Sequence, residues 1–226
     1  MLVWCAAGRA DDRPNILWIT AEDMSPVLGC YGDQFAVSPN IDRLAKESVR
    51  YTRAFASAPV CSPSRSCLIT GCYPTSLSTQ QMRSGFSIPK SMRGFPELLR
   101  ARGYYTSNNM KTDYNTGNYA DIIRHSWSES STTAHWRKRP DKKQPFFSIF
   151  NLMTSHQSRS MVWPYERFKK DVQSRLSVNE IHDPTKVPLP PYYPDTPLIR
   201  REMARFYDCV TAMDKEVGAT LQQLED

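Results

Sequence analysis

The sequence lacks several features that would place it in a special class of protein. No apolar run reaches the roughly 18 residues that a helix needs to cross a bilayer, which excludes a membrane-spanning helix in these 226 residues. No internal repeat is present. None of the six cysteines forms a Cys-x-x-Cys pair, so the spacing typical of a zinc site is absent. In a chain of this length the cysteines do not resemble a small disulfide scaffold either, and their connectivity stays open.

The composition is that of an ordinary soluble globular protein, with 40% hydrophobic and 23% charged residues. The formal net charge of +6 favours anionic partners. Lysine and arginine are spread along the chain, with one basic cluster between Arg137 and Lys143. Because this cluster lies in a polar stretch that contains proline, we expect a solvated loop rather than a nucleic-acid site.

The first ten residues have a short apolar core followed by small residues, as at the end of a signal peptide, but they lack its basic n-region. We interpret residues 1–12 as the remnant of a signal peptide or leader. A start codon assigned too late would explain the missing part.

Short apolar runs alternate with amphipathic segments along the chain, which is typical of an α/β fold. Residues 14–20 and 146–152 are apolar and contain β-branched or aromatic residues, so both predict buried strands. Capping residues, early prolines and terminal glycines predict helices at 38–47, 62–70 and 95–102, the last leading into a short strand at 104–106.

The remaining segments carry other signals. Residues 115–143 show no clear period and predict irregular surface structure. Six prolines between Asp183 and Pro197 forbid a regular helix or a central strand, so an extended surface segment is expected rather than a PxxP-type ligand. A long amphipathic helix at about 198–224 is predicted by one apolar face, which comprises Met203, Phe206, Val210, Met213, Val217, Leu221 and Leu224.

Polar side chains follow both predicted buried strands. Glu22 and Asp23 come after the first strand, and His156 lies just beyond the second. Open α/β sheets place their ligands at the carboxyl ends of strands, which favours a functional role for these residues. Solvated loop carboxylates and a satisfied surface or core histidine are the structural alternatives.

The segment Cys61-Ser62-Pro63-Ser64-Arg65 places a thiol at the N-terminus of a predicted helix. Free backbone N–H groups and the helix dipole favour an anion there, and Arg65, one turn on, could fork onto tetrahedral oxygens such as those of sulfate or phosphate. On these residues alone, a structural cysteine in a turn is an equal alternative.

This segment, followed by Leu68-Ile69-Thr70-Gly71, resembles the signature of the formylglycine-dependent sulfatases, C-x-P-S-R with a downstream T-G. Residues 14–23, 38–45 and 51–55 resemble further segments of that family in the same order. The resemblance implies an alkaline-phosphatase-like α/β sandwich with a central, mainly parallel sheet between helices. Residues 13–226 would form the N-terminal part of its catalytic domain, without the C-terminal strands, in a periplasmic or secreted protein.

The resemblance also implies a cofactor and a role for each matching residue. A formylglycine-generating enzyme would oxidise Cys61 to formylglycine (3-oxoalanine), whose hydrate offers one hydroxyl to attack sulfur and another to expel sulfate. The implied catalytic residues are Cys61, Arg65, Lys111 and His156, and the last three also bind substrate. The implied ligands of one divalent cation, such as Ca²⁺, are Glu22, Asp23 and Cys61.

Two positions depart from the family pattern. Glu22-Asp23 stands where two aspartates are usual, and Asp113 stands where a G-K-W-H-type motif has its histidine. The second departure speaks against proton transfer through position 113. Together with Met82-Arg83-Ser84 and residues 111–115, these features place the chain nearest to N-sulfoglucosamine sulfohydrolases and related bacterial sulfatases.

The predicted function is hydrolysis of sulfate esters or sulfamates on sulfated carbohydrates. A phosphonate or phosphodiester hydrolase of the same superfamily is one alternative, and a non-catalytic remnant that binds anionic glycans through Arg65, Lys111 and the basic cluster is another. In complete sulfatases a helix like 201–224 leads into a strand whose Asp-His or Asp-Asn pair completes the metal site. The chain ends before that strand, so we expect weak or no activity from these 226 residues alone.

Overall fold

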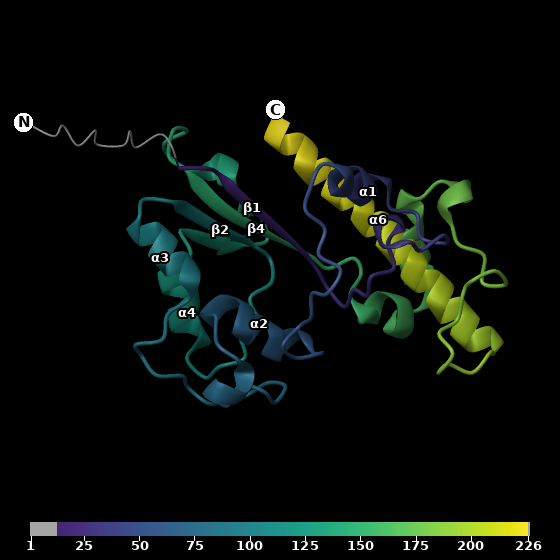
Figure 1. Cartoon of the computed structure of the whole chain (residues 1–226), viewed down its shortest axis with the longest axis horizontal. Coiled ribbons are helices and arrows are strands. Elements are labelled where there is room, and N and C mark those ends of the chain that lie inside the picture. The colour runs from purple at the N-terminus through teal and green to yellow at the C-terminus, as the bar shows by residue number, and fades with distance from the viewer. Residues whose placement is uncertain (1–12, 226) are drawn as a thin grey trace, which may run out of the picture. The chain divides into compact units, whose positions relative to one another are not determined.

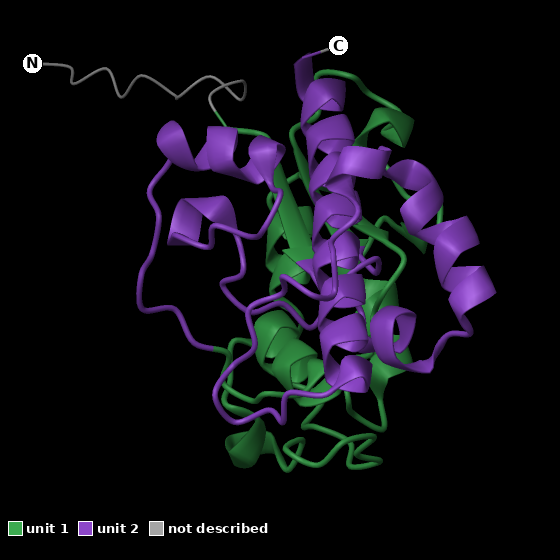
Figure 2. Ribbon diagram, turned by 90° about the vertical axis from the view of Figure 1, so that its right-hand side faces the viewer, with its two compact units in different colours: residues 1–20, 56–151 green, residues 21–55, 152–226 purple. Residues whose placement is uncertain are grey.

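The computed structural model describes residues 13–225, so the interpretation of residues 1–12 as a leader lies outside the described part. The chain divides into two compact units (Figure 2). Unit 1 contains the described residues up to Thr20 together with Ala56–Asn151, and unit 2 contains Ala21–Phe55 together with the chain from Leu152 onward. None of the helices in the described part is both long and apolar enough to span a membrane.

Unit 1 is built on a four-stranded sheet with the strand order β1-β4-β2-β3. Strand β2 runs parallel to β3 and to β4, with Ser107 opposite both Glu129 and Ser148. The expectation of an α/β fold with a mainly parallel sheet is confirmed. The strands and helices of this unit (Figure 1) are β1 Ile16–Ala21, α2 Cys61–Thr70, α3 Phe95–Ala101, β2 Tyr105–Asn109, α4 Tyr119–Ser126, β3 Glu129–Ser131 and β4 Phe146–Leu152.

Strand β4 contributes apolar side chains to both faces of this sheet, because alternate residues of a strand point in opposite directions. Phe147 and Ile149 belong to the larger core, which also receives residues from α2, α3 and α4. Phe146 and Phe150 lie on the other face against Trp136, whose ring stacks on Phe146 at 5.3 Å between centroids. The prediction that residues 146–152 form a buried strand is confirmed.

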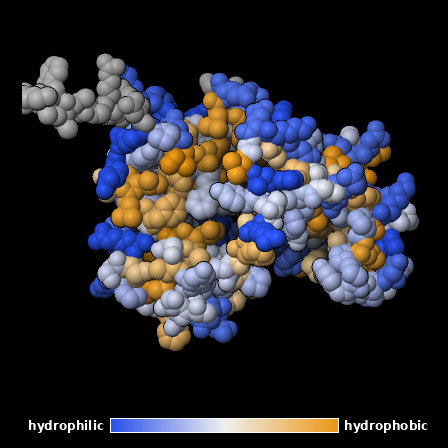
Figure 3. Space-filling model, viewed as in Figure 1, coloured by the Kyte–Doolittle hydropathy of each residue, from blue (hydrophilic) through white to orange (hydrophobic). Residues whose placement is uncertain are grey.

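Strand β1 occurs where the sequence predicted it, but the predicted burial is wrong. All six of its residues are partly exposed, because β1 lies at the edge of the described sheet and pairs with β4 alone. Figure 3 shows hydrophobic residues gathered over the sheet and α3, where Leu98 is 63% exposed.

A row of side-chain hydrogen bonds crosses all four strands near their carboxyl ends, and we call it the polar ladder. Thr20 Oγ1 of β1 donates to Asn151 Oδ1 of β4 at 3.0 Å, and Asn151 Nδ2 donates to Asn108 Oδ1 of β2 at 3.0 Å. Asn108 Nδ2 then donates to Ser130 Oγ of β3 at 3.0 Å. Both amides are buried, so a shift of any one strand would leave polar groups unpaired in the interior.

Residues 119–131 correct the expectation of irregular structure between 115 and 143. They form α4 and β3, and Ile122 and Trp127 are buried in the larger core of unit 1. Asn118 is a residue type favoured at a helix N-cap, but its side chain makes no cap hydrogen bond to α4, so packing stabilises the helix. Outside Trp136–Lys138, the stretch 132–143 has no regular element, and most of the basic cluster is exposed as expected.

Unit 2 contains helices α1 Pro39–Lys46, α5 Tyr165–Asp171 and α6 Pro197–Glu225, with short helical turns at Gly29–Tyr31, Ser158–Val162, Gln173–Arg175 and Val178–Glu180. The proline-rich segment before α6 forms no regular strand or long helix, as expected.

Helix α6 is buried on more of its surface than the single apolar face in its sequence predicted. Val210, Met213 and Val217 are buried as expected, but Leu224 is 46% exposed. Buried residues surround the middle of the helix because α1, the turn at Ser158–Val162 and the turn at Gln173–Arg175 all contact it.

Two buried aspartates of α6 hold the rest of unit 2. Asp214 accepts hydrogen bonds from the backbone N–H groups of Asn40 and Ile41, at 3.1 and 2.8 Å, and so caps α1. Asp208 accepts from the His182 backbone N–H at 2.8 Å, and its Oδ1 lies 2.9 Å from His182 Nδ1. His182, for which the sequence predicted no role, is thus part of the interior of this unit.

The polar ladder yields a stability prediction. We expect Asn151→Ala to lower the free energy of unfolding by about 2–4 kcal/mol, because it leaves partners on β1 and β2 unpaired in a buried position. Urea unfolding followed by circular dichroism measures the change. Gln80→Ala, at an exposed amide of the same unit, is the matched control and should stay within about 0.5 kcal/mol. Equal effects from the two variants would contradict a structural role for the ladder.

Candidate active site

Helix α2 begins at Cys61, one residue before the start that the sequence predicted. Val60 precedes it in an extended conformation and provides no side-chain cap, while Ser64 N donates to Val60 O at 3.0 Å. The first N–H groups of a helix have no partner within that helix, and they point at any anion placed before it. The helix ends at Gly71, whose φ of 71° is the left-handed conformation that favours glycine.

Asp113 lies at the centre of a cluster of charged side chains at this helix end. Its Oδ2 lies 3.7 Å from Cys61 Sγ and 3.8 Å from Lys111 Nζ, and its Oδ1 lies 3.2 Å from Arg83 Nη1. Lys111 is 12% and Asp113 is 21% exposed at the side chain, whereas Arg83 is 70% exposed. The structure therefore brings the predicted residues Cys61 and Lys111 together through Asp113, which the sequence had marked only as a departure from the family pattern.

Arg65 is buried, and its side chain makes two contacts that the sequence did not predict. Its Nε donates to Thr112 O at 2.8 Å and its Nη2 donates to Lys111 O at 2.7 Å. These two donors hold the backbone of the segment that carries Lys111 and Asp113. In this structure two donors of the Arg65 guanidinium group therefore bind carbonyl groups.

The segment after β2 has an unusual backbone. Met110, Asp113 and Asn115 all have positive φ values, of 80°, 48° and 52°. Such conformations cost free energy in residues other than glycine and persist where the surrounding contacts enforce them. The geometry of this segment is therefore imposed by its contacts.

Asn115 supplies part of that constraint, and sequence reasoning missed it. Its Nδ2 donates to Thr79 O at 2.6 Å and to Gln81 O at 2.8 Å, while its Oδ1 accepts from Ser84 N at 2.9 Å. The amide therefore fixes the loop that carries Arg83. An asparagine in a polar loop gives no sequence signal for such contacts.

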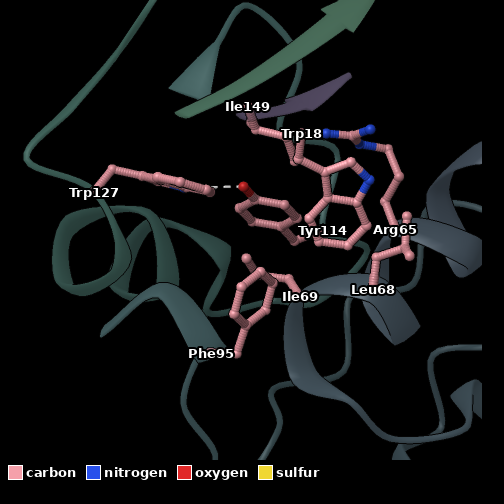
Figure 4. Close-up of a pocket in the computed structure, with 8 residues that line it drawn as sticks. All are labelled: Trp18, Arg65, Leu68, Ile69, Phe95, Tyr114, Trp127 and Ile149. Carbon is pink, nitrogen blue, oxygen red and sulfur yellow. Dashed lines mark hydrogen bonds between the residues drawn. The ribbon is translucent and has the colours of Figure 1, made fainter. Parts of the chain in front are cut away.

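Behind the segment, Tyr114 is fixed in the core of unit 1 (Figure 4). Its hydroxyl accepts a hydrogen bond from Trp127 Nε1 at 2.9 Å. Burial raises the pKa of Tyr114 to about 12, so the phenol is neutral at physiological pH. Its neighbours, among them Trp18, Ile69 and Phe95, leave a cavity of only 20 Å³, so the segment rests on a well-packed support.

The other predicted site residues lie in unit 2, where the chain leaves β1 and β4. Glu22 is buried, and its backbone N–H donates to Leu152 O at 3.2 Å. Asp23, with φ of 50°, accepts from Gln157 N at 2.8 Å, and its Oδ2 lies 3.9 Å from His156 Nε2. The two acidic residues and the histidine that follow the two predicted strands are thus neighbours.

Glu22 and Asp23 suit a hard divalent cation in kind, because Ca²⁺ prefers carboxylate oxygens. Two carboxylates alone are too few, however, since Ca²⁺ takes about 6–8 oxygen ligands. Within residues 13–225, no group of three or more histidine, cysteine, aspartate or glutamate side chains is placed to hold a metal ion. Glu22 and Asp23 thus remain candidate carboxylate ligands, and the calcium site itself stays a prediction.

Solved structures share the fold of this chain at low sequence identity. A structure described as a 2-O GAG sulfatase superposes with a TM-score of 0.65 and 17% identity, covering 95% of this chain and 55% of the other. A phosphonate monoester hydrolase of Agrobacterium radiobacter superposes with a TM-score of 0.67 and 17% identity, covering 94% and 59%. These likenesses confirm the alkaline-phosphatase-like α/β fold.

Sequence relatives are sulfatases over much or all of the chain. An ulvan-active sulfatase of Formosa agariphila is 36% identical over 253 aligned residues, which cover 95% of this chain and 41% of that protein. Human iduronate 2-sulfatase is 34% identical over 125 residues, covering 54% of this chain and 23% of that protein. The chain thus spans less than half the length of these relatives. Special closeness to N-sulfoglucosamine sulfohydrolases stays a prediction.

The sequence profile described as Sulfatase matches residues 14–226, which include Cys61, its neighbours in α2 and every other predicted site residue. This match covers nearly the whole chain, and it agrees with the fold and with the motif at the start of α2. The chain belongs to the Sulfatase family.

Proposed function

We propose that this chain carries the nucleophile of a hydrolase that cleaves sulfate esters or sulfamates on sulfated carbohydrates. The observation that carries the proposal is the position of Cys61 at the uncapped N-terminus of α2, with Asp113 Oδ2 at 3.7 Å from its sulfur and Lys111 beside that carboxylate. One relative, described as an ulvan-active sulfatase, supports a sulfated polysaccharide as the substrate class. The apolar and small residues at positions 1–10, together with the family, support a periplasmic or secreted location.

Two groups absent from the polypeptide as translated belong to this proposal. A formylglycine made from Cys61 would supply, as its hydrate, two hydroxyls on one carbon for attack on sulfur and release of sulfate. A divalent cation, Ca²⁺ in this proposal, would neutralise sulfate oxygens, and Glu22 and Asp23 are the carboxylates that would hold it.

The chain's own residues bind and orient the reacting group. The first N–H groups of α2 and the Lys111 ammonium would both attract sulfate oxygens. Asp113 holds Lys111 in place, and Arg65 holds the backbone of both residues through the Thr112 and Lys111 carbonyls. His156, beside Asp23, is proposed to lie near the leaving group.

One prediction of the proposed function concerns the nucleophile. When the chain is produced together with a formylglycine-generating enzyme, we expect Cys61 to be oxidised, because residues 61–65 match the signature of the family. Mass spectrometry of tryptic peptide 54–65, which contains no other cysteine, measures the conversion. Cys67→Ser, at the next cysteine of the same helix, should be converted as well as the natural chain. An unmodified Cys61 in both proteins would contradict the proposed nucleophile.

The second prediction concerns turnover. With Ca²⁺ and converted Cys61, we expect the chain to hydrolyse aryl sulfates in preference to phosphonate monoesters. We expect this hydrolysis to be weak, because the described residues offer few metal ligands. Cys61→Ala should abolish the hydrolysis, and Lys111→Ala should lower kcat/KM about 100-fold through loss of charge stabilisation. Lys90→Ala, at an exposed lysine of the same unit, should leave the rate unchanged. A preference for phosphonates would favour the alternative that the Agrobacterium structure suggests.

A further inference from the structure

Unit 2 contains a basic pocket that none of the predicted site residues lines. Its volume is 320 Å³, and four of its eight lining residues are the cations Arg159, Arg167, Lys170 and Arg175. Ligand pockets commonly begin at about 300 Å³, so a sugar ring with its substituents fits this size. We call this set of residues the basic pocket.

Two of the four cations are held rigidly by one indole ring. The guanidinium carbons of Arg159 and Arg167 lie 3.9 and 3.8 Å from the centroid of Trp163. Two guanidinium groups this close to one centroid cannot share a face, so they cover opposite faces of the ring. Trp163 therefore orients both arginines in advance, and neither of its faces is left to stack on a nucleic-acid base.

The negative charges near the pocket do not balance its cations. Asp171 Oδ2 accepts from Arg167 Nε at 3.4 Å, and Glu216 Oε1 accepts from Arg175 Nη1 at 2.5 Å. Within residues 13–225, no ion-pair partner reaches Arg159 or Lys170.

The pKa of Arg159 reflects its burial and the positive charge near it. Burial, and then the neighbouring Arg167 guanidinium, lower the pKa of Arg159. An anion in the pocket would relieve this repulsion and accept hydrogen bonds from the guanidinium groups.

We propose that the basic pocket of unit 2 is a binding site for a sulfated or carboxylated sugar of a polyanionic glycan. The four cations and the cavity indicate that the pocket binds an anion. The inference that this anion is a sugar rests on the proposed function. Because the faces of Trp163 are covered, neither a nucleic-acid base nor a sugar ring can stack on it, so the choice of a saccharide rests on the proposed function alone.

A binding experiment on the whole chain tests the site without requiring turnover. The probe is a fluorescently labelled heparin hexasaccharide, and the dissociation constant is measured by anisotropy at several salt concentrations. We expect the double variant Arg167→Gln/Lys170→Gln to raise the dissociation constant at least about tenfold, because charge-assisted contacts are lost. Lys170→Arg keeps the charge and should bind like the natural chain. Binding should weaken as salt rises, because screening acts over about 10 Å at 0.1 M.

Lys142→Gln/Lys143→Gln is the matched control, since it removes the same charge from the exposed basic cluster of unit 1. Equal weakening by the two double variants would overturn the proposal in favour of diffuse electrostatic attraction, and no binding by the natural chain would also overturn it. Equally tight binding of a single-stranded DNA of the same charge would overturn the assignment to a saccharide. Because Cys61→Ala keeps the pocket, its binding of the hexasaccharide should be unchanged, which separates this result from any failure of turnover.

Discussion

The polar ladder is the constraint on which the arrangement of unit 1 depends. When both faces of a strand are apolar, the hydrophobic pattern distinguishes one register from another only weakly, whereas a buried amide must find its partner. Asn151 and Asn108 tie β1, β4, β2 and β3 together in one register. The ladder thereby fixes the point at which β2 ends and the segment with Lys111 and Asp113 begins. The chain also passes from unit 1 to unit 2 directly after Thr20 and Asn151, the ladder's outer and central members.

Much of the fold could be predicted because the relevant signals are local. Residues 146–152 form β4 as predicted, and α2 begins within one residue of its predicted start and ends before Gly71 as predicted. Helix α4 was not predicted, because its eight residues give only a short apolar pattern and the helix depends on the packing of Ile122. The partial exposure of β1 was not predictable either, since a strand's place in the sheet is a property of the whole fold.

The candidate site shows the same division between local and distant information. The signature around Cys61 predicted the family and the helix end, both of which are encoded within a few residues, and the role of Cys61 as the nucleophile stays a proposal. The contact between Cys61 and Asp113 joins residues 52 positions apart, and the Asn115 clamp on the loop of Arg83 spans more than 30. Arg65 illustrates the limit most clearly, because its chemistry suits an anion and a pair of carbonyl groups equally well. In the fold, its Nε and Nη2 donate to two carbonyl groups, and a contact of Arg65 with sulfate stays a prediction.

The left-handed backbone at Asp113 also limits which residues can replace one another there. With φ at 48°, a β-branched or bulky side chain would be strained, whereas asparagine, aspartate and histidine adopt this conformation more readily than other residues with a side chain. Histidine, which the family motif has at this position, and aspartate are both on that short list, and their codons differ by a single base. One mutational step can therefore exchange an imidazole for a carboxylate beside Cys61, the proposed nucleophile, in a loop whose backbone already suits both residues.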